Sequence, residues 1–176
     1  MNFDFLSKEK LKTFAKEHKT LVRFFVGFCV FMFVLKIATL FLTIGINPTH
    51  SISEKYVLIH RHAIPDRNEI IVFRQPSQPI HPPTTQFVKF LRGLPGDIVK
   101  VEGNVIFING EKAATAIDLD PSGKPFSPLA FSGIIPPHQY LALGTAPDAF
   151  DSRYEAFGLV DESNIIGSGP WAWGHH

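Results

Sequence analysis

The chain has 176 residues and a formal net charge of +1. This near-neutral balance argues against a protein that binds nucleic acid by neutralising phosphates. Cys29 is the single cysteine, which excludes an intrachain disulfide and a cluster of thiolate metal ligands. The length allows one domain of about 130 residues beside a further segment.

The N-terminal part of the chain is a basic segment followed by an apolar run. Residues 1–23 hold six lysines and arginines against three acidic residues, and residues 24–46 are almost entirely apolar. As a helix rising about 1.5 Å per residue, the run would be roughly 34 Å long, enough to cross a hydrocarbon core of about 30 Å. Basic segments next to a transmembrane helix usually remain on the cytoplasmic side of the membrane. We therefore predict a cytoplasmic segment at 1–23, a transmembrane helix at 24–46 and an extracytoplasmic domain at 47–176.

Lys36 is the one charged residue in the apolar run. A lysine near the middle of a span costs about 2.5–3.5 kcal/mol on insertion scales, which the other residues of the run can offset. Two alternatives to a simple anchor stay open: a cleaved signal peptide with residues 24–35 as its core, and a helix whose Lys36 faces a membrane partner. The long basic leader, and the lack of a pair of small residues after the core, favour a retained anchor.

Short apolar, β-branched runs between turn residues predict a mainly β domain after the anchor. Asn109-Gly110 predicts a type I′ reversal between two of these strands. Residues 74–85 and 115–135 are rich in proline, with glycines in the second stretch, so they are expected to be loops, the first framing a cleft. The expected strands lie at 56–59, 69–73, 87–91, 98–101, 105–108, 140–144 and within 157–166.

Lys89 stands among apolar residues in the run Phe-Val-Lys-Phe-Leu at 87–91. A strand buried on both faces would strip water from the ammonium and lower its pKa, by as much as ~3–5 units when burial is complete. A lysine that is neutral near pH 7 can act as a general base. Most lysines with apolar neighbours lie instead on edge strands and extend to water, so burial decides between the two interpretations.

The turn Gly-Leu-Pro-Gly-Asp at 93–97 follows the lysine strand. Its two glycines can adopt positive φ, its proline fixes φ, and its aspartate can close the turn. Together with Lys89, this pattern resembles the lysine box of bacterial type I signal peptidases, serine proteases that use a lysine in place of a histidine. The resemblance implies a catalytic role for Lys89 and supporting roles for Gly93, Pro95 and Asp97.

Asn-Pro-Thr-His-Ser at 47–51 comes directly after the apolar run. It is similar to the Asn-x-Thr-x-Ser element of the conjugative-transfer branch of that family, the TraF type. The resemblance implies Ser51 as nucleophile, with Ser53 as the alternative, and the Thr49 hydroxyl and Ser51 backbone N–H as oxyanion donors. The family usually continues with a hydrophobic residue, proline and glycine, whereas 53–55 is Ser-Glu-Lys, so the shape of the substrate-facing loop stays open.

Asp-Ser-Arg at 151–153 resembles the last box of the family. There the aspartate and arginine interact and support the site, a role carried over to Asp151 and Arg153. The alternative is an ordinary surface ion pair, worth ~0–1 kcal/mol. The family's serine two positions before the aspartate is Ala149 here, so Lys89 has one fewer implied partner and the effect of this change stays open.

In the implied mechanism, Ser51 Oγ attacks the scissile carbonyl while Lys89 accepts its proton and later passes one to the leaving amine. A histidine triad oriented by Asp151 is the rival hypothesis, and no motif singles out its base. Neither a cofactor nor a metal is expected. The candidate histidines are His50, His60, His62, His81 and His138.

The resemblance covers roughly residues 46–167 and implies an antiparallel β-sheet, signal-peptidase-like catalytic domain behind a single N-terminal transmembrane helix. The implied enzyme sits in the bacterial inner membrane, with its N-terminus in the cytoplasm and its catalytic domain in the periplasm. Its expected partners are a prepilin or other preprotein substrate, inner-membrane lipid and conjugative-transfer (type IV secretion) components, with no nucleic acid. Hydrolysis and cyclisation of a pilin both stay open. The alternatives are a housekeeping leader peptidase and a non-catalytic β module of a transfer or secretion complex.

Overall fold

The computed structural model describes residues 13, 16–61, 63, 65–75, 82, 84–117 and 127–175. It divides into two compact units, Met1–Leu40 and Phe41–His176. Helix α2 (Lys19–Phe41) is apolar along most of its length and buries none of its residues. Its length and composition suffice to cross a membrane.

Helix α2 ends earlier than the sequence predicted. We expected a helix at 24–46, but residues 42–46 form strand β1 (Leu42–Ile46), which pairs antiparallel with β2 (Glu54–Arg61). Three β-branched residues in this stretch favour an extended chain. Gly45 favours the pairing as well, because a Cβ there would lie 2.7 Å from Cδ1 of Ile59. The helix prediction for 42–46 was therefore wrong.

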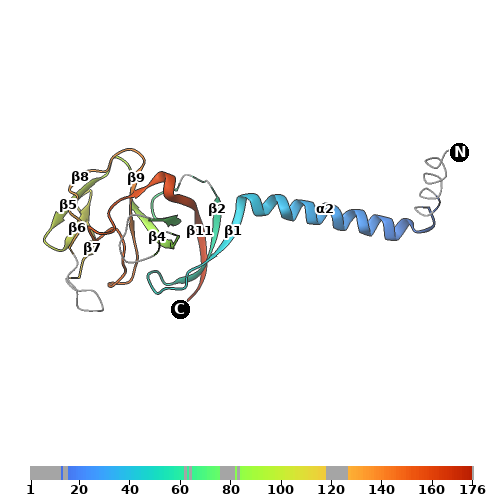
Figure 1. Ribbon diagram of the computed structural model, residues 1–176, viewed down its shortest axis with the longest axis horizontal. Coiled ribbons are helices and arrows are strands. Elements are labelled where there is room, and N and C mark those ends of the chain that lie inside the picture. The colour runs from blue at the N-terminus through green and yellow to red at the C-terminus, as the bar shows by residue number, and fades with distance from the viewer. Residues whose placement is uncertain are drawn as a thin grey trace. The chain divides into compact units, whose positions relative to one another are not determined.

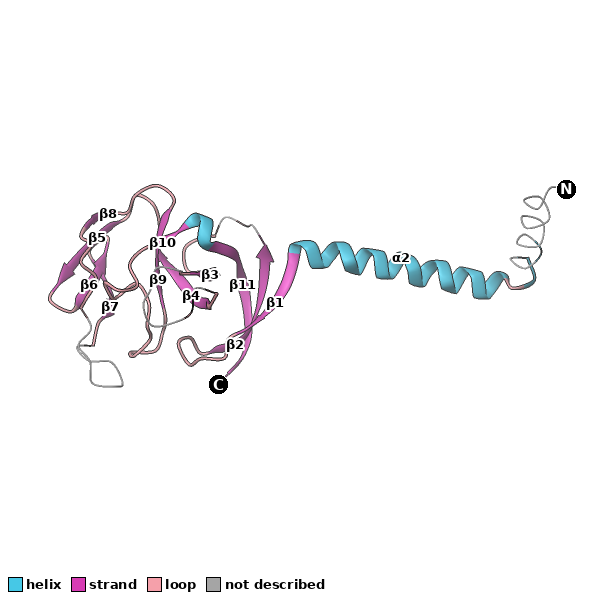
Figure 2. Cartoon of the chain, viewed as in Figure 1, coloured by secondary structure: helices cyan, strands magenta, loops and turns pink. Residues whose placement is uncertain are grey.

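Among the residues that the structure describes, the larger sheet has seven antiparallel strands in the order β1-β2-β11-β3-β4-β9-β10. The last strand in the chain, β11, lies between β2 and β3 and thereby joins the β1–β2 hairpin to the β3–β4 hairpin. A short 3-10 turn, Glu162–Asn164, leads into it (Figure 2). The further strands are β3 (Ile70–Arg74), β4 (Gln86–Gly93), β9 (Gln139–Leu143), β10 (Val160–Asp161) and β11 (Ile165–His175).

The smaller sheet has the order β7-β6-β5-β8. Figure 1 shows its strands gathered at one end of the β domain, away from β1, β2 and β11. Asn109 and Gly110 have φ values of 53° and 85°, which confirms the predicted type I′ reversal. The predicted excursion at 115–135 contributes the short strand β8. The strands are β5 (Ile98–Glu102), β6 (Val105–Ile108), β7 (Glu111–Thr115) and β8 (Gly133–Ile134).

Three apolar clusters hold the β domain together. One contains Phe73, Phe87 and Phe157, and the Phe157 ring packs edge to face against Phe87 and Phe73, with centroids 5.2 and 5.9 Å apart. A second lies under the small sheet, and the third includes Ile52, which is fully buried directly after Ser51. Burying such a side chain contributes roughly 1.5–3 kcal/mol, so Ile52 fixes the serine loop to the core. The mainly β, antiparallel architecture with one N-terminal apolar helix confirms the predicted fold class.

Candidate active site

Lys89 lies on β4, with β3 on one side and β9 on the other, and its side chain is 3% exposed. The edge-strand interpretation is therefore wrong for this lysine. Burial lowers its pKa from 10.5 to about 8, because the charged form loses hydration. The nearby carboxylates of Asp151 and Asp148 raise the pKa, while Arg153 lowers it further.

The Lys89 amine stands without a hydrogen bond or ion pair to any residue that the structure describes. Its neighbours along β4 are mostly buried and apolar. For this reason the loss of hydration lowers the pKa of Lys89 more than the nearby carboxylates raise it. A pKa near 8 leaves about a tenth of the lysine neutral at pH 7. This is the protonation state that a general base requires.

Ser51 lies in the loop between β1 and β2. Its Oγ is 2.9 Å from Oγ1 of Thr49. Its carbonyl oxygen accepts hydrogen bonds from the backbone N–H groups of Thr145 and Ala146, at 2.8 and 3.3 Å. The serine loop is thus fastened both to the core, through the buried Ile52, and to the loop that follows β9.

A cavity of about 490 Å³ brings the predicted nucleophile and base together. Three segments line it: 47–51, 85–89 and 148–150. Thr49, Ser51 and Lys89 all belong to this lining, as does the buried Ala149 that replaces the family's serine. Among the hydrogen bonds that the structure describes, none joins Ser51 Oγ to Lys89 Nζ.

Asp151 and Arg153 form a buried ion pair, with 2.8 Å between Nε and Oδ1 and exposed side-chain fractions of 0% and 4%. The surface-pair alternative is therefore wrong. Arg153 also donates to the carbonyls of Pro147 and Gly144, and Gly144 N–H donates to Asp151 Oδ2 at 2.6 Å. The pair thus holds the loop that touches the Ser51 carbonyl.

Gly144 explains why that loop can approach the serine so closely. A Cβ built on this residue would lie 2.4 Å from the Ser51 carbonyl oxygen and 2.7 Å from the Cβ of Ala149. No side chain fits in that space without moving backbone. Gly144 was absent from the predicted site because a lone glycine after a strand carries no signal of such a contact.

The turn after β4 contains the remaining predicted residues. Asp97 Oδ1 accepts from Arg67 and Asn109, and Oδ2 accepts from Leu94 N–H, all at 2.7 Å. Gly96 has the expected positive φ of 91°. Gly93 does not, so that prediction was wrong.

Gly93 is needed instead for close packing, because a Cβ there would lie 2.7 Å from Cδ1 of Ile135. Pro95 lies between Leu94 and Gly96 in the same turn, outside the cavity that Ser51 and Lys89 line. Gly93, Pro95 and Asp97 therefore do not line the cavity that contains Ser51 and Lys89, and they shape the end of the strand that carries Lys89.

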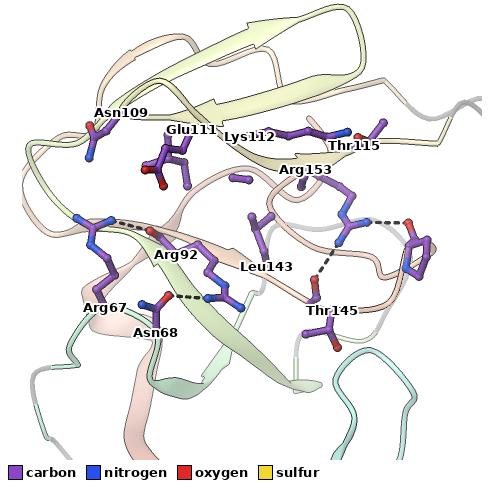
Figure 3. Close-up of a pocket in the computed structure, with 15 residues that line it drawn as sticks. Arg67, Asn68, Arg92, Asn109, Glu111, Lys112, Thr115, Leu143, Thr145 and Arg153 are labelled. Atoms are coloured by element: carbon purple, nitrogen blue, oxygen red, sulfur yellow. Dashed lines mark hydrogen bonds between the residues drawn. The ribbon is translucent and has the colours of Figure 1, made fainter.

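A larger cavity, of about 800 Å³, lies elsewhere and contains neither Ser51 nor Lys89 (Figure 3). Its guanidinium groups are engaged: Arg67 bonds the Arg92 carbonyl and Asp97, Arg92 bonds the Asn68 side chain, and Arg153 bonds the loop after β9. The guanidinium groups of this cavity are therefore already hydrogen-bonded to other residues, and the larger volume alone does not identify it as the active site.

The alternative of a histidine triad requires Asp151 to orient the histidine. The Asp151 carboxylate is taken up by Arg153 and by Gly144 N–H. His50 lines the cavity that contains Ser51 and Lys89. His138 pairs with Glu162, with 2.8 Å between Nδ1 and Oε2. His60 is exposed on β2, and His62 and His81 lie outside the described residues.

The comparison with protein families agrees with this geometry. The family model described as signal peptidase, peptidase S26, matches residues 17–173, and the chain belongs to this family of serine proteases. A probable signal peptidase I-2 of Synechocystis sp. is 28% identical over 129 residues, which are 70% of this chain and 56% of that protein. The signal peptidase I of Rickettsia typhi is 26% identical over 141 residues, 62% of this chain and 52% of that protein.

A shorter stretch is closer to another relative. The signal peptidase I of Rickettsia bellii is 48% identical over 48 residues, 27% of this chain and 15% of that protein. This chain spans about half the length of the Synechocystis and R. typhi proteins. A signal peptidase I crystal structure from Enterococcus faecalis V583 is 27% identical, with a TM-score of 0.41 over 60% of this chain and 97% of that chain.

Proposed function

We propose that this chain is a membrane-anchored serine endopeptidase in which Ser51 is the nucleophile and Lys89 the general base. The observation that carries the proposal is a buried lysine with a pKa near 8 that lines the same cavity as a serine. The membership of the chain in a serine protease family supports the same reaction, cleavage of a peptide bond by a serine nucleophile. Desolvation is the physical cause that makes the amine a base near neutral pH.

In the proposed reaction, Ser51 Oγ attacks the scissile carbonyl carbon as its proton passes to Lys89 Nζ. The carbonyl electron pair moves to the oxygen, where the Thr49 hydroxyl and the Ser51 backbone N–H donate to it. Lys89 then gives its proton to the leaving amine. Water, or another amine, resolves the acyl-enzyme.

Two features support these assignments. The Ser51 N–H has no acceptor among the described residues, so it is available to an oxyanion. The Ser51 hydroxyl contacts Thr49 and lines the same cavity as Lys89. Catalytic hydrogen bonds often tighten only in the complex with substrate.

The proposed substrate is the leader peptide of an exported protein, with a conjugative prepilin as the first choice. Helix α2 would anchor the enzyme in the inner membrane, and its basic flank would keep the N-terminus in the cytoplasm. Ser51 would then act on the periplasmic side, near the membrane surface. The nucleophile element at 47–51 is the feature that favours a pilin over a broad set of substrates.

The test uses full-length protein in detergent micelles, incubated with a prepilin and, separately, with an unrelated preprotein. Ser51→Ala and Lys89→Ala should abolish cleavage, whereas the matched control Ser53→Ala, at an exposed position, should cleave like the wild type. Full cleavage by Ser51→Ala would overturn the proposal. Loss of activity in Ser53→Ala alone would move the nucleophile to that residue.

The same experiment separates the remaining alternatives. Cleavage of both precursors at similar rates would indicate a housekeeping leader peptidase. Absence of Ser51-dependent cleavage of either would indicate a non-catalytic module. Mass spectrometry of the product distinguishes hydrolysis from cyclisation, because a cyclic pilin is one water lighter.

A further inference from the structure

Asn47 is buried at the start of the serine loop, with 1% of its surface exposed. Its amide nitrogen Nδ2 donates to the carbonyls of Ile52 and Glu54, at 3.3 and 3.1 Å. Its Oδ1 accepts from both the backbone N–H and the hydroxyl of Thr49, at 3.2 and 2.9 Å. Its own backbone N–H donates to the carbonyl of Lys55 at 2.8 Å. One side chain therefore ties both sides of the loop that presents Ser51.

These contacts determine which way the hydroxyl protons point. The two carbonyls can only accept, so Nδ2 must face them and Oδ1 must face Thr49. Oδ1 carries no proton, so the single Thr49 hydroxyl proton lies on the bond to Asn47. In the 2.9 Å contact between the two hydroxyls, Ser51 is therefore the donor. The protons run in one direction, from Ser51 to Thr49 to Asn47.

We infer that Asn47 is a positioning residue for the reaction at Ser51, and this inference rests on the function proposed above. Its Oδ1 holds the Thr49 hydroxyl beside the nucleophile and keeps the hydroxyl proton engaged in the resting protein. When Ser51 gives its proton to Lys89, Thr49 loses the hydrogen bond donated by Ser51. The Thr49 O–H can then turn from Asn47 towards the oxygen of the tetrahedral intermediate.

The two ends of the Asn47 amide have separable roles. Nδ2 shapes the loop and contributes to stability, whereas Oδ1 acts through one hydroxyl group. A residue with only the structural role would lower the rate equally whether or not Thr49 has its hydroxyl. A positioning residue would lower the rate only when that hydroxyl is present.

A double-mutant cycle with Asn47→Ala and Thr49→Val tests this difference on the full-length protein in detergent. Displacing a catalytic group by about 1 Å costs on the order of 10²-fold, so Asn47→Ala alone should lower kcat by about that factor, with KM little changed. In the Thr49→Val background, the same change should lower kcat by less than about threefold. Asn47→Ala should lower the unfolding temperature in both backgrounds, because the Nδ2 bonds and the Oδ1 bond to the backbone N–H of residue 49 are lost in both. Equal fold losses of kcat would overturn the inference.

A second measurement needs neither an Asn47 variant nor catalytic activity. Three-bond couplings to the Thr49 methyl carbon report whether its side chain holds one rotamer. If Asn47 is the anchor, Ser51→Ala should leave that rotamer unchanged, although the other hydroxyl is gone. Rotamer averaging in Ser51→Ala would overturn the inference. A single rotamer in a protein without Ser51-dependent cleavage would reject only the proposed function.

Discussion

Lys89 and Asp97 are both buried, one within β4 and the other in the turn that follows it, yet their surroundings have opposite effects on their charge. Lys89 has no polar partner among the described residues, and burial lowers its pKa to about 8, towards the neutral form. Burial alone would raise the pKa of Asp97, but donors from Arg67, Leu94 N–H and Asn109 lower it to about 2, which favours the carboxylate. A buried ionisable group without hydrogen-bond partners is shifted towards its neutral form, as Lys89 is. A buried group with several hydrogen-bond donors keeps its charge, as Asp97 does.

Replacing Lys89 gives the largest effect expected from this comparison. Lys89→Met should lower kcat by at least about 10⁴-fold, because the nucleophile loses its base. It should also raise the unfolding free energy at pH 7, by up to about 3 kcal/mol, since a buried amine with a pKa of 8 rather than 10.5 opposes folding. Cleavage assays and denaturant unfolding check the two results. The exposed Lys100→Met is the control, and a cleaving Lys89→Met would contradict the assignment.

The pH dependence of cleavage gives the next largest effect. Because only neutral Lys89 accepts a proton, kcat/KM should fall about tenfold per unit below pH 8, hence about 10²-fold by pH 6. Unfolding free energy should rise between pH 8 and 10.5, where the unfolded lysine binds more protons than the folded one. Initial rates and unfolding curves across this range provide the measurement. An activity limb centred near pH 6.5 would point instead to histidine.

Asp97→Asn tests the other half of the comparison. A carboxyl pKa of about 2 against an ordinary 3.8 corresponds to about 2 kcal/mol, which the variant should lose at pH 7. In the wild type this contribution is present above pH 4 and disappears as the pH falls towards 2, because the folded pKa is the lower one. Denaturant unfolding of Asp97→Asn and the wild type at pH 7 and near pH 2 measures the difference in unfolding free energy, with the exposed Asp66→Asn as control. Equal stability of Asp97→Asn and the wild type at pH 7 would contradict it.

Arg67→Met should have the smallest effect. The Arg67 side chain is 39% exposed, so water screens its ion pair with Asp97 and the loss should be about 1 kcal/mol or less. The pKa of Asp97 should rise but stay below its ordinary value, because Leu94 N–H and Asn109 still donate. An NMR titration of the carboxyl carbon gives that value. A return to the ordinary pKa would mean that Arg67 alone keeps Asp97 charged.

Local patterns predicted much of the fold, and they named the residues that the structure places around one cavity. The apolar neighbours of Lys89 left burial and an exposed edge strand both open, and the resemblance to the lysine box favoured burial, whereas Asn109-Gly110 alone specified its reversal. The end of α2 was misplaced because residues 42–46 are as apolar as a membrane span. Only pairing with β2 makes them a strand, and that contact is not local.

The remaining misses concern contacts between distant segments. Gly93 was assigned a turn role, whereas its packing against Ile135 requires the small sheet to be in place. Gly144 meets Ser51 across almost a hundred positions of the sequence, and no local pattern reports that approach. Asn47 lay inside the recognised motif, but its role depends on where five hydrogen bonds lead. The sequence thus indicated the proposed nucleophile and base better than the contacts that hold them in place.

The position of β11 affects when the site can form during synthesis. In the order of the large sheet, β11 lies between the hairpin that follows Ser51 and the hairpin that carries Lys89, and it comes after both of them in the sequence. A chain translated only as far as β10 would therefore hold both Ser51 and Lys89 but would lack the strand that joins β2 to β3. If the proposed function holds, such a chain could not yet cut its neighbours or itself, because the proposed nucleophile and base would not share one continuous sheet.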